Sequence, residues 1–243
     1  MFTLFLTSSP CNNTDGAIFE ENGLRDELLR QVPAGAHALM VASDPSDTCG
    51  NDMASVGLRG TMERAGLSFA SWKILDRRNQ HHQVSSLIRK SDFIILCGGH
   101  VPTQHHFFSQ IYLREELRAF QGTLLTISAG SMNCADIVYS LPEYPGEAIS
   151  PSYQRFFPGL GLTSVQILPH YYMWKGGKVD DLLVYEEIAA EDSMGRRFYV
   201  FPDGTYLFSK FGYEEIRGEA YIIENGIFRQ VCEDGQKVLL PII

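Results

Sequence analysis

Residues 123–136 read T-L-L-T-I-S-A-G-S-M-N-C-A-D, and this stretch decides the fold that the chain is expected to adopt. The apolar run at residues 124–127 favours a buried strand. The small residues 128–130 then allow a sharp turn, and residues 129–139 are compatible with a helix. A serine at the tip of a strand–turn–helix unit has the geometry of a nucleophile elbow. The stretch therefore predicts a candidate nucleophile, Ser128, at the end of a strand.

Ser128 also has a purely structural interpretation. Serine is a common residue at the N-cap of a helix, and the usual elbow pattern G-x-S-x-G is incomplete because Thr126 occupies its first glycine position. As a nucleophile, Ser128 would lie beside the backbone N–H groups that begin the next helix, where an oxyanion is stabilised. The rest of the chain has to decide between the two interpretations.

Apolar runs without polar alternation recur along the first 140 residues and alternate with helix-like segments. Such strands, separated by helices, indicate a parallel sheet that is covered on both faces. The predicted fold is therefore α/β and doubly wound, with a mostly parallel sheet. Strands are expected at residues 2–7, 36–42, 69–75, 93–96 and 123–127, and helices at residues 24–32, 51–65, 80–90, 103–120 and 129–139.

The remainder of the chain has a different pattern. Residues 140–162 are rich in proline, glycine and aromatic residues and predict a long structured loop; a short strand is expected at 164–168, and 180–191 could form a helix. The turn sequences at 202–204 (P-D-G) and 224–226 (E-N-G) lie between β-rich runs, which predicts hairpins. This β portion is expected to pack on an edge of the sheet. With no linker or repeat in its 243 residues, the chain is expected to form a single domain.

Composition argues against several classes of protein. The net charge is −9 and the basic residues are scattered, which disfavours nucleic acid and anionic membranes as partners. No apolar run approaches the roughly 20 residues that span a bilayer. The five cysteines are odd in number, irregularly spaced and free of C-x-x-C pairs, as is typical of thiols in a reducing compartment. We therefore expect a cytoplasmic protein, either a monomer or a homodimer.

Residues with catalytic potential follow three of the expected strands, at the edge where α/β sheets bind their ligands. Gly98 and Gly99 follow the fourth strand and could present a backbone N–H to an oxyanion, with the N–H of Ala129 as a second donor. Ser128 ends the fifth strand. His170 follows the strand at 164–168, and a neutral imidazole there could accept the serine proton. Together these positions favour the nucleophile interpretation of Ser128.

A catalytic histidine needs a carboxylate to orient it, and Asp136 and Glu143 are both candidates by position. Each feature also has an ordinary interpretation when taken alone. His170 could be a surface or capping residue, the glycine pair could be a simple turn, and Glu143 could be solvated. Their joint appearance at successive strand ends carries more weight than any one of them.

No metal or cofactor is predicted. The densest group of histidines, His100, His105 and His106, has no acidic or cysteine partner at the spacing of a zinc site. The segment K-G-G-K at residues 175–178 lacks the pattern of a phosphate-binding loop.

The order and spacing of these motifs resemble the peptidase E (aspartyl dipeptidase) and cyanophycinase family. These are serine peptidases on a flavodoxin-like, class I glutamine amidotransferase-like fold. The resemblance rests on strand–Gly-Gly–helix, then strand–S-A-G–helix, then G-L-G-L at 159–162 leading to Q-I-L-P-H-Y at 166–171. It implies Ser128 as nucleophile and His170 as base. It also implies Glu143, rather than Asp136, as the third member of the triad.

The resemblance also implies that the segment C-G-G-H-V at residues 97–101 supplies the oxyanion hole, with Gly99 as a donor beside Ala129. Three positions depart from the family pattern: Cys97 and Thr126 replace glycines, and His100 replaces an asparagine. Peptidase E also follows its histidine with a basic stretch that resembles a site for a substrate aspartate. Residues 174–181 carry a different arrangement, so the resemblance leaves open whether an N-terminal aspartate is preferred.

The sequence therefore predicts a serine-type hydrolase, similar to dipeptidase E, that acts on small peptides with a free N-terminus or on a related small molecule. Class I glutamine amidotransferases carry cysteine at the elbow tip, so glutamine hydrolysis by a thiol is disfavoured here. One alternative is a hydrolase of another ester or amide bond. A second is a catalytically degenerate binding or regulatory protein on the same fold, which the changes at Cys97, His100 and Thr126 favour.

Overall fold

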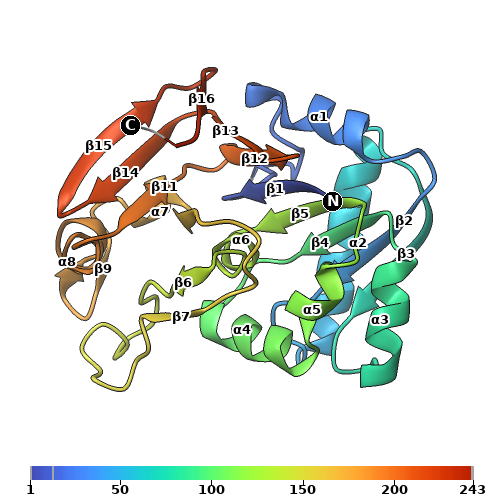
Figure 1. Cartoon of the computed structure of the whole chain (residues 1–243), viewed down its shortest axis with the longest axis horizontal. Helices are drawn as coiled ribbons and strands as arrows, with labels where there is room; N and C mark the ends of the chain where they lie inside the picture. Colours follow the sequence, from blue (N-terminus) through green and yellow to red (C-terminus); the bar gives the residue numbers. More distant parts are fainter. Residues whose placement is uncertain (1, 13, 242–243) are drawn as a thin grey trace.

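The structure, a computed structural model, describes residues 2–12 and 14–241 and is built around one large, mostly parallel sheet (Figure 1). Its eight strands follow the order β16-β13-β12-β1-β5-β4-β2-β3. The five strands from β1 to β3 in this order are parallel, and the three at the other end are antiparallel. The predicted doubly wound α/β fold is confirmed. The strands are β1 (Thr3–Thr7), β2 (Ala36–Val41), β3 (Phe69–Leu75), β4 (Phe93–Leu96), β5 (Thr123–Ile127), β12 (Tyr206–Lys210), β13 (Tyr213–Arg217) and β16 (Lys237–Leu239).

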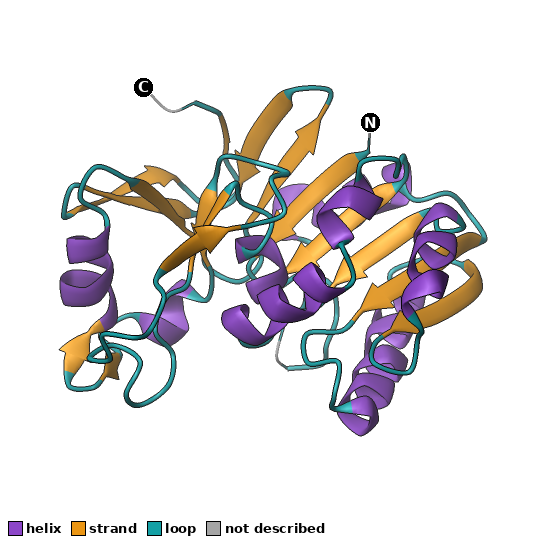
Figure 2. Cartoon of the chain, turned by 60° about the horizontal axis from the view of Figure 1, so that its bottom comes forward, coloured by secondary structure: helices purple, strands orange, loops and turns teal. Residues whose placement is uncertain are grey.

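Helices cover both faces of this sheet, as Figure 2 shows. Because successive side chains of a strand point to opposite faces, β4 sends Phe93 and Ile95 into one core and Ile94 and Leu96 into another. The first core is closed by α1 (Leu24–Gln31) and α2 (Thr48–Arg64). The second is closed by α3 (His81–Arg89), α4 (Val101–Gln110) and α5 (Leu113–Leu117).

Two predicted helices are shorter than expected. The helix expected at 103–120 is divided into α4 and α5 by Tyr112, whose φ of 51° is left-handed and interrupts helical geometry. The helix expected at 129–139 ends early: α6 is Ala129–Met132, and β6 (Ile137–Tyr139) follows it. Residues 137–139, which were expected to lie in this helix, pair instead with β7 (Phe156–Pro158).

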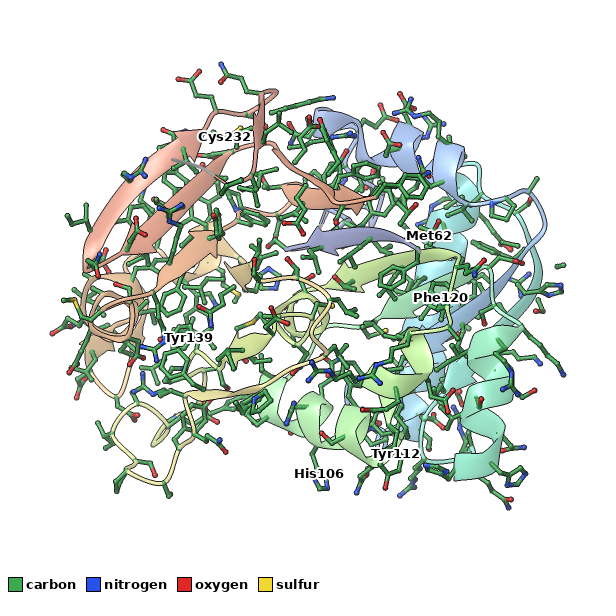
Figure 3. All side chains as sticks on the ribbon, viewed as in Figure 1. Met62, His106, Tyr112, Phe120, Tyr139 and Cys232 are labelled. Carbon is green, nitrogen blue, oxygen red and sulfur yellow. The ribbon has the colours of Figure 1, made fainter. Side chains whose placement is uncertain are left out.

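A second sheet stands beside the first, in the order β15-β14-β11-β8. It consists of β8 (Gln166–Leu168), β11 (Arg197–Val200), β14 (Ala220–Glu224) and β15 (Ile227–Cys232). Its core contains Tyr139, whereas Met62 belongs to a core of the main sheet, and Figure 3 shows the two residues well apart. Smaller elements in this half of the chain are α7 (Tyr171–Trp174), β9 (Lys178–Val179), β10 (Leu182–Leu183), the π-helical turn η2 (Val184–Ala189) and α8 (Ala190–Asp192), and a 3-10 turn, η1 (Glu21–Gly23), precedes α1.

The two predicted hairpin turns have different outcomes. Asn225 and Gly226 do join β14 to β15, with φ of 50° and 77°. The turn at residues 202–204, by contrast, joins no hairpin: β11 lies in the second sheet and β12 in the first. This turn carries the chain from one sheet to the other, and its central residue, Asp203, is thereby brought to the site described below.

None of the helices in residues 2–12 and 14–241 has the length and hydropathy that crossing a bilayer requires.

Candidate active site

Ser128 lies at a strained turn that its neighbours hold in place. Its φ of 50° and ψ of −115° are rare for a residue with a side chain. Its backbone N–H donates to the carbonyl oxygens of Thr7 and Ser8, both at 3.0 Å, at the end of the adjacent strand β1. Strain of this kind persists only where the surroundings over-determine the conformation, and it is concentrated at functional sites. The predicted strand–turn–helix unit is present, with Ser128 at its tip.

Thr126, which departs from the glycine of the elbow pattern, has a structural role beneath this turn. Its side chain is fully buried, and its hydroxyl donates to the carbonyl of Phe5 at 3.0 Å. It also lies 2.7 Å from the hydroxyl of Ser131, which in turn donates to the carbonyl of Thr7. The threonine therefore adds a hydrogen bond between β5 and β1 and a polar contact with α6, and it leaves Ser128 at the tip of the turn.

The glycine pair after β4 allows the backbone to approach the elbow closely. A Cβ atom on Gly98 would lie 3.0 Å from Cβ of Ser128, and one on Gly99 would lie 1.9 Å from Oγ of Ser43. No described residue accepts a hydrogen bond from the N–H of Gly99, and Ala129 is the first residue of α6, whose N–H has no partner within the helix. Both N–H groups are thus available for an oxyanion, as the sequence predicted, although their catalytic use stays a prediction.

His170 joins the second sheet to the elbow. It follows β8 with a left-handed φ of 60°, and its Nε2 lies 2.9 Å from Oγ of Ser128. Its Nδ1 lies 2.8 Å from Oδ1 of Asp203. A carboxylate can only accept, so Nδ1 carries the proton and Nε2 is left to accept from the serine hydroxyl. The expected contact between Ser128 and His170 is present, and both side chains are partly open to solvent.

Asp203, and not Glu143 or Asp136, is the carboxylate that orients His170, which corrects the assignment made from the sequence. Burial opposes ionisation of Asp203, but hydrogen bonds from His170 and Ser8 outweigh it and hold its pKa below the usual value. The hydroxyl of Ser8 donates to Asp203 at 2.6 Å and accepts the backbone N–H of His170 at 2.7 Å. Sequence reasoning overlooked both residues; the available signal was an acidic residue directly after the apolar run of β11.

Glu143 lies near His170 but does not bond to it. Its backbone N–H donates to Oε2 of Glu147 at 2.9 Å, and its own carboxylate makes no hydrogen bond or ion pair with any described residue. Burial and the charge of Glu147 raise the pKa of Glu143 to about 7, and the charge of His170 partly offsets this rise. Asp136 is exposed and lines a surface pocket of about 510 Å³ that includes neither Ser128 nor His170.

His100 connects the oxyanion segment to the loop between β6 and β7. Its Nδ1 lies 2.8 Å from the hydroxyl of Thr103, and its Nε2 lies 3.1 Å from Oε1 of Glu147. The ring of Tyr144 packs against its imidazole, with centroids 5.1 Å apart. Cys97, the other departure in this segment, is half-buried, and desolvation of its thiol raises the pKa to about 12, so the thiol stays protonated and is unsuited to act as a nucleophile.

Within the described ranges, no three His, Cys, Asp or Glu side chains come together as metal ligands do. His105 packs on Phe157 with ring centroids 4.2 Å apart, and burial lowers its pKa. His106 lies 3.0 Å from the amide of Gln110 and points away from the body of the protein (Figure 3). The histidine cluster seen in the sequence is thus dispersed in space.

Several solved structures share this fold, and two of them are peptidases by name. A peptidase from an acI-B1 actinobacterium superposes with a TM-score of 0.63 at 16% sequence identity, covering 99% of this chain and 97% of its own. A peptidase E candidate from Listeria monocytogenes EGD-e gives a TM-score of 0.58 at 16% identity, covering 95% and 99% of the two chains. No protein-family model and no curated protein sequence matches this chain. The expected resemblance to peptidase E is thus confirmed at the level of the fold.

Proposed function

We propose that this protein is a serine-type hydrolase that cleaves an amide bond of small peptides, with Ser128, His170 and Asp203 as its catalytic triad. The observation that carries the proposal is the unbroken chain of contacts from Oγ of Ser128 through both ring nitrogens of His170 to Asp203, at 2.9 and 2.8 Å. Three elements from separate parts of the sequence converge to form it. The strained φ of 50° at Ser128 supports the same conclusion.

In the proposed mechanism, Oγ of Ser128 attacks the peptide carbonyl while Nε2 of His170 accepts the hydroxyl proton. Asp203 keeps the imidazole in the required tautomer and stabilises the imidazolium. The N–H groups of Gly99 and Ala129 hold the oxyanion of the tetrahedral intermediate. The C–N bond then breaks, and His170 returns its proton to the leaving amine. Water, activated by the same histidine, hydrolyses the acyl-enzyme and regenerates Ser128.

Labelling with a fluorophosphonate, read by intact mass, tests the nucleophile. We expect one adduct on the wild type and none on Ser128→Ala. Asp136→Asn is a matched control, since that carboxylate lies outside the site, and it should be labelled at the wild-type rate. Labelling of Ser128→Ala to the same extent as the wild type would overturn the assignment.

A substrate panel then separates a peptidase from a hydrolase of other acyl bonds. Dipeptides, simple esters and simple amides are compared by kcat/KM, and the proposal expects dipeptides to be preferred. The degenerate-site alternative is weakened because Thr126 and His100 have structural partners that leave the contact between Ser128 and His170 intact. All five cysteines are free, consistent with the cytoplasmic location that we infer. The oligomeric state and the single domain stay predictions.

A further inference from the structure

Glu143 is a half-buried carboxylate near the proposed triad for which the mechanism has no use. No described residue bonds to its side chain, and its pKa is raised to about 7 by burial and by Glu147. A buried carboxylate without a partner is costly, and such groups are normally paired with a cation or neutralised by a proton. The feature therefore calls for either a structural or a functional explanation.

The loop that carries Glu143 is fixed from several sides. Both carboxylate oxygens of Glu147 are occupied, one by His100 at 3.1 Å and the other by the backbone N–H groups of Glu143 and Tyr144 at 2.9 and 3.1 Å. The carboxylate of Asp180 accepts the N–H groups of residues 146 and 148 at 2.6 and 2.9 Å. Glu143 is consequently the one carboxylate of this pair that remains available, and its backbone is held in position.

No described lysine or arginine is paired with Glu143, and the charge of His170 only partly offsets the rise in its pKa. Arg155, on the same loop, is engaged elsewhere: it is paired with Asp192 and donates to the carbonyl of Ala148 at 2.8 Å. When Glu143 is ionised it therefore places a negative charge near the catalytic histidine, which is the opposite of what recognition of an acidic substrate requires.

We propose that Glu143 binds the α-ammonium group of the substrate residue that carries the scissile carbonyl. This inference rests on the proposed function, since His170 marks where that carbonyl must lie. In a dipeptide the α-ammonium is bonded to the carbon next to the scissile carbonyl, so it is held close to the catalytic histidine whatever the side chain. Pairing with it gives the half-buried carboxylate the partner that it lacks. Glu143 is thus a determinant of specificity for a free, positively charged N-terminus.

Binding to an inactive variant tests this without turnover. In the Ser128→Ala background, calorimetry compares Ala-Ala with N-acetyl-Ala-Ala. We expect the free dipeptide to bind at least about ten-fold more tightly, the usual strength of a charge-assisted hydrogen bond, and Glu143→Gln to remove that preference. Asp136→Asn, which changes a carboxylate outside the site, should retain it. Equal binding of the two peptides, or a preference that survives Glu143→Gln, would overturn the inference.

Proton release supplies a readout that a merely structural role would not produce. At pH 6.5 a carboxyl group with a pKa of about 7 is mostly protonated, whereas an α-amino group, with an ordinary pKa of about 7.7–8.0, is charged. Binding of Ala-Ala should then release a large fraction of a proton, detected by calorimetry in buffers of different ionisation enthalpy, and Glu143→Gln should abolish it. Unchanged release in the variant would contradict the role. A wild-type protein that is not labelled by the fluorophosphonate would instead contradict the proposed function. The failure of this inference and the failure of the proposed function are therefore distinguishable.

Discussion

The hydroxyl of Ser8 donates a 2.6 Å hydrogen bond to the carboxylate of Asp203, 195 positions later in the chain. Because Ser8 directly follows β1, a central strand of the main sheet, this contact holds the turn between β11 and β12 against that sheet. The same hydroxyl accepts the backbone N–H of His170. One buried serine therefore sets the relative position of two proposed catalytic residues, both of which enter the site from the second sheet.

Replacing Asp203 by asparagine should lower kcat/KM by about 10³–10⁴-fold, because an amide can hold His170 in the wrong tautomer and cannot stabilise an imidazolium. The rate of fluorophosphonate labelling should fall in parallel. Glu143→Gln should leave that labelling rate close to the wild type, because Glu143 does not touch His170. If Glu143→Gln rather than Asp203→Asn suppressed labelling, the orienting role would have to return to Glu143.

Ser8→Ala tests a positioning residue. It removes two hydrogen bonds at a fully buried position and leaves Asp203 and the N–H of His170 each without one partner. We expect the free energy of unfolding to fall by about 1–3 kcal/mol and kcat to fall more than KM changes. Ser8→Thr, which keeps the hydroxyl, should recover most of kcat. If Ser8→Ala lost stability but kept the wild-type kcat, Ser8 would have a structural role only.

The parts of the fold that could be predicted are those that local pattern determines. Apolar runs without alternation place five parallel strands to within one or two residues, because strands covered on both faces have no polar side. The break at Tyr112 could not be predicted, since a left-handed φ at a tyrosine depends on the tertiary setting. The turn at residues 202–204 was interpreted as a hairpin because its sequence suits one, while the pairing of β11 and β12 with different sheets is not a local property.

The residues of the site, like the elements of the fold, could be predicted where a local pattern marks them. Ser128 and His170 each follow a recognisable strand, so their positions marked them as candidates, and the family resemblance then implied their roles. The third member of the triad was assigned by its distance along the chain from the serine, which selected Glu143. In space, Asp203 reaches His170 because β11 lies parallel to β8, and their carboxyl ends therefore meet at one edge. That pairing is a property of the folded sheet; near residue 203 the sequence shows only an acidic residue after an apolar run, within a turn pattern that suits a hairpin.

The raised pKa of Glu143 predicts how stability depends on pH. The folded-state pKa of about 7 lies above the ordinary value of 4.5, so the folded state binds the proton more tightly than the unfolded state does. The stability that this proton contributes is fully present below about pH 4.5 and is lost as the pH rises through about 7. Glutamine does not titrate, so Glu143→Gln escapes this loss. Its free energy of unfolding, relative to that of the wild type, should therefore rise by on the order of 1–3 kcal/mol between pH 5 and pH 8. Urea unfolding at several pH values measures this difference, and a difference independent of pH would mean that Glu143 titrates normally.

Thr126→Gly would restore the glycine of the usual elbow pattern, and we expect it to damage this protein. The change leaves a cavity at a fully buried position, removes the hydroxyl that donates to the carbonyl of Phe5, and adds backbone freedom to the unfolded chain. These effects act in the same direction, so the free energy of unfolding should fall by about 2–4 kcal/mol in urea titrations. Thr126→Ser keeps the hydroxyl and loses only a methyl group, so it should cost about 1 kcal/mol. If Thr126→Gly were instead as stable as the wild type and more active, the threonine would be a defect in the elbow, and the degenerate-site alternative would regain its support.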